Sequence, residues 1–252
     1  DALPEAPCAI EDIRVREGGS PLFLQFDHAD AGPDPMGFIL DNSVLKAGLY
    51  RTAATRPGIT IVSPASVERL ERNGEAATAV LADGRRITAK LAVAADGRVS
   101  PTRRAAGLRT TELSYGQTAI TCTVAHELPH DHMAFEHFRP AGPFAMLPLN
   151  DAADGTHQSC LVWSERTDAA NALMQLPDGA FDLEMQTAFG DTLGRLHVTG
   201  KRWAYPLGLI HAERYIDQRL VLVGDAAHGI HPISGQGFNL GLRDIAALAD
   251  TI

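Results

Sequence analysis

The sequence is poor in basic residues, in cysteines and in long apolar runs. Its 252 residues carry 22 Lys and Arg against 31 Asp and Glu, a net charge of −9, so it lacks the basic excess that binds a nucleic-acid backbone. No apolar run reaches the roughly 18–20 residues that a membrane span needs. The three cysteines, Cys8, Cys122 and Cys160, are far apart, which is typical of a reducing compartment and gives no metal-ligand spacing.

A dinucleotide-binding GxGxxG turn is also absent. Gly18-Gly19 precedes a strand-like run and lacks the required spacing. The chain starts at Asp1 without a charged and apolar leader, so we interpret this start as internal and infer nothing from it about location. With 45% hydrophobic and 21% charged residues, the composition is that of a folded globular protein.

The apolar patterns predict an α/β fold. Short apolar runs predict buried strands at Leu91–Ala95 and Leu220–Val223, and a short β-branched run predicts another at Ile59–Val62. Alternating runs from Ser66 to Ala89 predict a meander, and residues 117–163 read as a more antiparallel, strand-rich region. Helices are expected over residues 42–54, 169–173, 181–189 and 240–252. The simplest arrangement is a mostly parallel sheet covered on both faces, interleaved with a β-rich layer.

The stretch RLVLVGDAAHGIHPISGQGFNLGL, which starts at Arg219, carries the strongest sign of chemistry. Gly224-Asp225 ends a predicted parallel strand, where open α/β sheets bind ligands, and a carboxylate there can accept hydrogen bonds from sugar-like hydroxyls. Gly235-Gln236-Gly237 is expected at a helix start, whose free N–H groups stabilise an anion. A ribityl-linked isoalloxazine would use both features.

This stretch allows two other interpretations. A Rossmann phosphate loop needs its first glycine directly after the strand, whereas Gly235 lies eleven residues beyond Gly224. The glycines could also serve turns in a plain strand–loop–helix unit. The combination of Asp225, Pro232 and the second glycine turn argues against that simpler reading.

The segment GDAAHGIHPISGQGFNLGLRDIAALAD resembles the second flavin motif of FAD-dependent aromatic-ring monooxygenases, most of all the ubiquinone-biosynthesis hydroxylases acting on polyprenyl phenols. AADGRVSPTRR, from Ala94, resembles the motif that joins flavin binding to the path of NAD(P)H. Weaker similarity extends over most of residues 38–252. The implied fold is the FAD/NAD(P)-binding fold of the p-hydroxybenzoate hydroxylase type, incomplete here, interleaved with a mixed β-sheet substrate domain.

The resemblance implies a set of cofactor-binding residues. In the second flavin motif these are Gly224, Asp225, Pro232, Gly235, Gln236, Gly237, Phe238 and Asn239, and in the other motif Asp96, Gly97 and Arg103. Asp41 starts the first helix where relatives place a flavin-contacting segment, although relatives usually have Arg where this chain has Ser43. A helix cap explains Asp41 equally well. No side chain is needed as a nucleophile, because the flavin does the chemistry.

The resemblance also implies a division of the chain. Residues 1–40 and 109–207 would belong to the substrate domain, and residues 41–108 and 208–252 to the FAD-binding domain. Because the βαβ unit that binds the ADP half of FAD is not found, we expect this chain alone to be isolated without FAD: charge-assisted hydrogen bonds contribute about 1.5–3 kcal/mol each. A GxGxxG unit encoded upstream would support this interpretation.

The implied function is an FAD-dependent, NAD(P)H-using monooxygenase that hydroxylates a prenylated phenol with O2. It would be cytoplasmic, without a transmembrane segment, and peripheral to the inner membrane or part of a multi-enzyme complex. Two alternatives remain open: a non-catalytic scaffold in a quinone-biosynthesis assembly, and another flavin oxidoreductase of the same fold, such as a reductase or halogenase.

Other residue groups give weaker predictions. Phe138, Phe144, Met146 and Leu147 are candidates for an apolar substrate pocket, although core packing explains them about as well. The histidines of HELPHDHMAFEH, His126, His130, His132 and His137, are expected in a solvated loop, because Pro129 interrupts any helix and no regular metal-ligand spacing appears. Trp163 and Trp203 are expected in the core.

Overall fold

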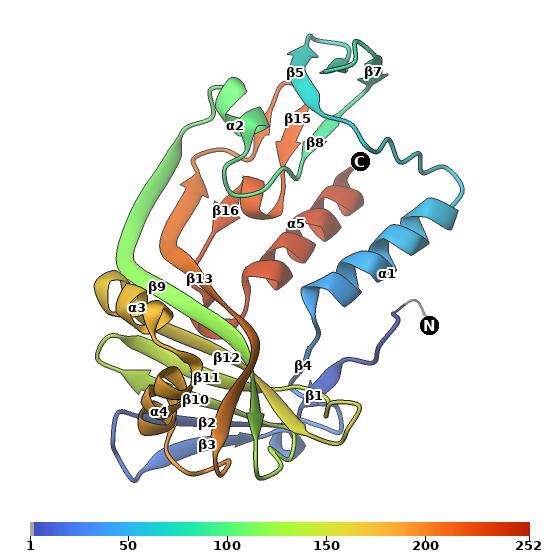
Figure 1. Ribbon diagram of the computed structural model, residues 1–252. Coiled ribbons are helices and arrows are strands. Elements are labelled where there is room, and N and C mark those ends of the chain that lie inside the picture. The colour runs from blue at the N-terminus through green and yellow to red at the C-terminus, as the bar shows by residue number, and fades with distance from the viewer. Residues whose placement is uncertain (1–2) are drawn as a thin grey trace. The chain divides into compact units, whose positions relative to one another are not determined.

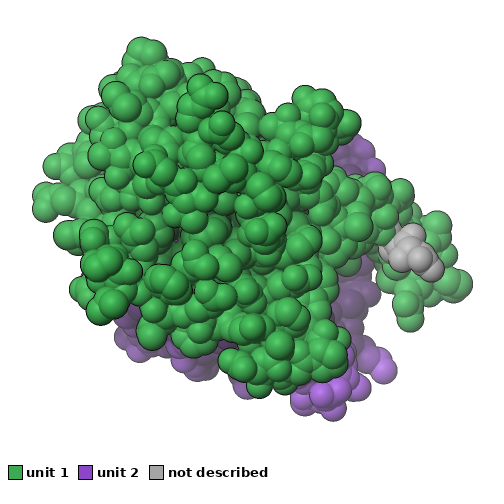
Figure 2. Space-filling view, turned by 90° about the horizontal axis from the view of Figure 1, so that it is seen from below, with its two compact units in different colours: residues 1–60, 116–206 green, residues 61–115, 207–252 purple. Residues whose placement is uncertain are grey.

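The computed structural model describes residues 3–252 and divides the chain into two compact units (Figures 1 and 2). Unit 1 comprises Asp1–Thr60 and Gly116–Pro206, and unit 2 comprises Ile61–Tyr115 and Leu207–Ile252. Two long strands, β9 (Thr110–His126) and β13 (Leu196–Ala212), each contribute residues to both units. The mixed α/β composition agrees with the predicted fold class. The assignment of a function to each segment remains a prediction.

Unit 1 is built on a mixed sheet. Beside β13 its strands follow the order β9, β12 (His157–Arg166), β11 (Gly142–Pro148), β10 (Met133–Arg139), β2 (Asp12–Glu17) and β3 (Phe23–Asp27). The β10–β2 pair is parallel, and the other pairs from β9 to β3 are antiparallel. The antiparallel character expected for residues 117–163 is therefore confirmed.

Helices α3 (Thr167–Gln175) and α4 (Asp178–Phe189) cover one face of this sheet (Figure 1). Their apolar side chains, Phe181 and Phe189 among them, pack on sheet residues that include Phe144, Met146 and Trp163. This layer is the main hydrophobic core, because a sheet face and an amphipathic helix each bury their apolar side against the other. Unit 1 also holds a small sheet of β1 (Cys8–Ile10) and β4 (Gly37–Ile39), followed by helix α1 (Asn42–Thr55).

Unit 2 contains the parallel strand pair predicted from the apolar runs. Strand β8 (Ala92–Ala94) pairs in parallel with β15 (Leu220–Leu222), and β14 (Ile216–Asp217) pairs with the other edge of β15. The predicted meander forms a separate antiparallel sheet of β5 (Val67–Arg72), β6 (Ala77–Leu81) and β7 (Arg86–Ala89). Strand β16 (His228–Gly229) pairs with the end of β13, while α2 (Pro101–Ala105) and α5 (Gly237–Thr251) are the helices of unit 2.

Three expectations are wrong. Ile59–Val62 forms no strand, since no described strand pairs with it and Ile59 and Ile61 remain exposed; an apolar run needs a neighbouring ladder to become a strand. Trp203 is 52% exposed, with the Lys201 ammonium over its ring, whereas Trp163 is buried as expected. The terminal helix begins at Gly237 rather than Leu240, because glycine's low helix propensity hides the first turn in the sequence.

Candidate functional site

The loop after β15 presents an exposed carboxylate. All three residues of β15 are buried, and the chain then turns through a short 3-10 helix, Gly224–Ala226. Gly224 has φ +56, in the left-handed region that favours glycine, and Asp225 is exposed. Because β15 and β8 are parallel, Asp225 lies at the carboxyl end of the pair, where open α/β sheets bind ligands.

Helix α5 approaches this loop through a contact between two glycines. A Cβ on Gly241 would lie 3.2 Å from the Cα of Gly224, and one on Gly224 would lie 3.9 Å from the Cα of Gly241. Any larger residue at position 241 would press on the loop backbone. The two glycines therefore set how closely the helix and the Gly224–Asp225 turn can pack.

Asp244 secures the same loop, and the sequence reasoning did not identify it. Its Oδ2 accepts a hydrogen bond from the Gly224 backbone N–H at 2.8 Å and one from His228 Nε2 at 2.7 Å. His228 is 8% exposed, so this pair is largely shielded from water. The sequence does contain one sign of this role, because Asp244 is an acidic residue on the mostly apolar helix that follows the glycine turn.

The start of α5 offers unpaired backbone donors beside this loop. Gly235 adopts the left-handed conformation with φ +62, and Gln236 caps the helix without a side-chain hydrogen bond. The first N–H groups of a helix, here those of Gly237, Phe238 and Asn239, have no carbonyl partner within the helix. The helix start expected at Gly235-Gln236-Gly237 is confirmed, whereas the start at Leu240 expected from the apolar pattern lies three residues too late; the positive end of the helix dipole lies at the glycine turn.

The turn before the helix is held locally. Pro232 begins a 3-10 turn that ends at Ser234, and the His231 side chain accepts a hydrogen bond from the Ile233 N–H. The Asn239 side-chain amide donates to Gln236 Oε1 at 3.2 Å. Burial lowers the pKa of His231, which favours its neutral form.

The Asp96–Arg103 motif forms a capped turn, as predicted. Ser100 caps α2 by accepting from the Arg103 N–H at 3.0 Å, and Pro101 occupies the first helical position. Gly97 has φ +82. Burial opposes ionisation of Asp96, but hydrogen bonds from Ser100 and Thr102 more than offset it, so the pKa of Asp96 is lowered.

Arg103 joins this motif to the loop of Asp225. The side chain is 2% exposed; its Nη1 donates to the Ala226 carbonyl at 2.7 Å, and its Nη2 donates to the Arg98 carbonyl at 3.0 Å. These bonds satisfy the guanidinium with backbone oxygens. Arg103 thus holds two predicted cofactor-binding segments together, and its direct contact with a cofactor remains a prediction.

Asp41 belongs to unit 1, where it caps α1. Its carboxylate accepts from the Ser43 backbone N–H at 2.6 Å and from the Ser43 hydroxyl, and these bonds lower the pKa of Asp41. The predicted helix cap is therefore confirmed. Asp41 also lines a cavity of about 280 Å³ within unit 1, whose other lining residues include Asn42, Thr123 and Cys160.

The four candidate substrate residues do not share one pocket. Phe144 and Met146 are fully buried in the core under α3 and α4. Side chains alternate between the two faces of a strand, so Leu147 lies on the opposite face, together with Phe138 of the neighbouring strand. The correction is that Phe144 and Met146 are core residues, while Phe138, which is 39% exposed, and Leu147 remain candidates.

The expectation of a solvated loop is only partly correct: His132 is exposed, whereas His126, His130 and His137 are buried. His126 bonds to the Leu128 carbonyl and to Ser159, and His130 Nε2 lies 2.8 Å from the Leu149 carbonyl. His137 stacks on Phe189, and burial lowers its pKa to about 4. The sequence reasoning missed His126 and His137 because strands β9 and β10 carry them into the sheet, while His130 and His132 do lie in the loop between these strands.

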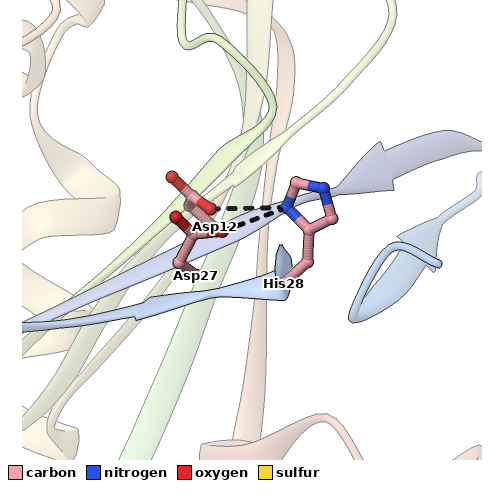
Figure 3. A group of neighbouring side chains, drawn as sticks. All are labelled: Asp12, Asp27 and His28. Carbon is pink, nitrogen blue, oxygen red and sulfur yellow. Dashed lines mark ion pairs between the residues drawn. The ribbon is translucent and has the colours of Figure 1, made fainter. Parts of the chain in front are cut away.

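A different group has the spacing of metal ligands. Asp12, Asp27 and His28 lie close together at the edge of unit 1 (Figure 3), and they are the only such group among residues 3–252. His28 Nδ1 lies 3.7 Å from Asp12 and 3.5 Å from Asp27, distances typical of loose ion pairs. All three side chains are partly exposed, so we interpret the group as surface electrostatics.

The unit 2 site fits a flavin. An exposed carboxylate suits the hydroxyls of a ribityl chain, and the start of α5 supplies N–H groups to an electron-rich ring. Gly224 and Gly241 have no side chains, so the loop and α5 pack backbone against backbone at this point. Among the described residues, no helix is both long and apolar enough to cross a bilayer.

Comparison with known proteins supports this fit. Ubiquinone hydroxylase UbiL of Rhodospirillum rubrum is 46% identical over 243 residues, covering 96% of this chain and 55% of UbiL. The 3-demethoxyubiquinol 3-hydroxylase of Escherichia coli is 34% identical over 228 residues, covering 90% of this chain and 56% of that protein. The chain thus spans a little over half the length of these relatives.

Solved structures share the fold at low identity. Pseudomonas aeruginosa PqsL in complex with 2-aminobenzoylacetate aligns with a TM-score of 0.78 at 22% identity, covering 95% of this chain and 66% of PqsL. The p-nitrophenol 4-monooxygenase PnpA of Pseudomonas putida aligns with a TM-score of 0.75 at 19% identity, covering 97% of this chain and 62% of PnpA. The model of the FAD binding domain family matches residues 25–252, so the chain belongs to the FAD binding domain family.

Proposed function

We propose that the protein is a flavin-dependent monooxygenase that hydroxylates a prenylated phenol ring in ubiquinone biosynthesis, with NAD(P)H and O2 as co-substrates. The observation that carries this proposal is the arrangement within unit 2, where Asp225 and the start of α5 flank one loop. Similarity to two ubiquinone-pathway hydroxylases over at least 90% of the chain supports the substrate class.

The residues of this chain would bind and orient the cofactor. Asp225 would accept hydrogen bonds from the ribityl hydroxyls, while the backbone N–H groups from Gly237 to Asn239 would stabilise negative charge on the ring. Asp244 and Arg103 would keep the loop of Asp225 in place through its backbone. When bound, FAD supplies the redox chemistry, in which reducing equivalents from NAD(P)H allow one atom of O2 to enter the phenol ring.

The protein would lie in the cytoplasm at the periphery of the inner membrane, because an apolar prenylated substrate would be found in that membrane. Association with other enzymes of the same pathway would follow from the same substrate. The purified 252-residue chain is expected to lack FAD. An absorbance spectrum tests this expectation, because bound FAD would give a visible flavin band in proportion to the protein.

The test uses the full-length protein loaded with FAD. NADPH or NADH oxidation is measured with and without a short-chain prenylphenol, and products formed under ¹⁸O₂ are analysed by mass spectrometry. Phenol-stimulated oxidation with one ¹⁸O in the product is expected. If the rate of NADPH or NADH oxidation is the same with and without the phenol and no labelled product forms, the proposal is refuted. A scaffold or another flavin oxidoreductase would then be favoured.

A matched pair of variants tests the role of the site. Asp225→Ala should weaken flavin binding at least tenfold, because charge-assisted hydrogen bonds contribute about 1.5–3 kcal/mol each. Asp250→Ala removes an exposed aspartate on the same unit, at the far end of α5, and should leave flavin binding unchanged. Equal flavin affinity in both variants would remove Asp225 from the cofactor site.

A further inference from the structure

Glu136 lies on the face of the unit 1 sheet that faces away from α3 and α4. Its neighbours on β10, Phe135 and His137, contact the core on the helix side: Phe135 belongs to the core cluster and His137 stacks on Phe189 of α4. Because side chains alternate along a strand, Glu136 points to the opposite face (Figure 1 shows the strand and both helices).

The strands beside Glu136 give it no hydrogen-bond donor. Its register partners are Ala145 on β11 and Val15 on β2, both apolar. The nearest arginines of β2, Arg14 and Arg16, are in register with Phe135 and His137 and therefore lie on the helix side. The carboxyl group is thus placed on an apolar stretch of sheet without a basic partner.

The carboxyl group is nevertheless sheltered from water. Its Oε1 is buried and has no hydrogen-bond partner among residues 3–252, while the residue as a whole keeps part of its surface exposed. Burial alone raises the pKa of Glu136 to about 7. An unpaired buried acid destabilises a fold, so packing gives no reason for a carboxyl group here rather than an apolar side chain.

An apolar surface with one phenylalanine lies next to this carboxyl group. Phe138 follows Glu136 on the same face of β10 and is 39% exposed, and Leu147 lies on the same face of β11. A ligand with an apolar ring and one hydroxyl would pack on Phe138 and donate its hydroxyl proton to Oε2 of Glu136, the carboxyl oxygen that is not buried. A purely apolar ligand would leave that oxygen unsatisfied.

We propose that Glu136 is a specificity-determining residue of unit 1, which accepts a hydrogen bond from the ring hydroxyl of a phenolic ligand packed against Phe138. The inference rests on the proposed function, whose substrate is a phenol, and it assigns the hydroxyl of that substrate to one side chain. It predicts that the protein distinguishes a phenol from the corresponding methyl ether, which has the same ring but no donor.

The test measures equilibrium binding of two probes, 2-(3-methylbut-2-enyl)phenol and its methyl ether, to the full-length, FAD-loaded protein. At pH 8, where this carboxyl group is ionised, Glu136→Leu should weaken binding of the phenol about tenfold and leave binding of the ether unchanged, as loss of one hydrogen bond to a charged group implies. Glu136→Gln keeps an acceptor oxygen and should retain most of the preference. Glu184→Gln, at an exposed position of α4 on the other side of the sheet, is the matched control and should bind both probes like the wild type.

Each outcome decides between the two proposals. If the wild type prefers the phenol and Glu136→Leu keeps that preference, the assignment to Glu136 is overturned while the proposed function stands. Equal weakening of both probes would also overturn it, by showing a general packing role. If the wild type binds neither probe, both the assignment and the proposed function fail. Flavin content and circular dichroism confirm that each variant is folded.

Discussion

Replacing Glu136 by glutamine should stabilise the chain, and increasingly so as the pH rises. In the folded chain burial raises the pKa of this carboxyl group from 4.5 to about 7. Well below pH 4.5 the group is protonated in both the folded and the unfolded state. Between pH 4.5 and 7 the unfolded chain ionises first, so it binds fewer protons than the folded chain and the free energy of unfolding falls. Above pH 7 this loss is complete.

The size of the effect follows from the pKa difference. Each pKa unit corresponds to about 1.36 kcal/mol, so the ionisable group costs the folded state about 3 kcal/mol at pH 8 and less than about 1 kcal/mol at pH 5. Glutamine has nearly the same shape and no charge at either pH. Glu136→Gln should therefore gain about 2 kcal/mol over the wild type between pH 5 and pH 8.

Urea denaturation of the 252-residue chain at these two pH values measures the difference. Glu17→Gln removes an exposed carboxyl group from the adjacent strand and controls for the loss of one charge. If the difference in free energy of unfolding between the wild type and Glu136→Gln is the same at both pH values, the carboxyl group is solvated or paired. That result would refute the reasoning.

Three further changes test the structure. Gly241→Ala places a Cβ 3.2 Å from a backbone atom of the Asp225 loop, so it should destabilise the chain by about 1–3 kcal/mol in urea denaturation, whereas Gly179→Ala, with open space around it at an exposed position of α4, should be neutral or stabilising. Asp244→Asn loses a carboxylate that accepts two hydrogen bonds, and a fall of about 1–3 kcal/mol in the same assay is expected; an unchanged midpoint would contradict the anchoring role. Burial raises the pKa of Cys122 to about 12, so this thiol should react with a disulfide reagent at pH 8 only after unfolding, and rapid native labelling would contradict its burial.

The local sequence was sufficient wherever short-range chemistry decides the structure. Ser100 and Pro101 form the predicted cap because the cap requires only a side-chain oxygen and a residue that tolerates the first helical position. The positions of strands β8 and β15 were equally clear from their apolar runs, although only β15 is fully buried and Val93 of β8 is 48% exposed. The motif around Asp225 also identified the family that the comparison then showed.

Tertiary structure decided which partners the remaining residues meet. Ile59–Val62 has the composition of a strand but lacks a described neighbour to pair with, and hydrogen bonding between strands is not encoded in one segment. Phe138 and Phe144 look alike in the sequence, yet strand register places them on opposite faces of one sheet. The lack of a polar partner for Glu136 also follows only from strand register, which places Ala145 and Val15 on its two sides. Resemblance of local motifs thus indicated the family, while long-range pairing determined which side chains are available to a ligand.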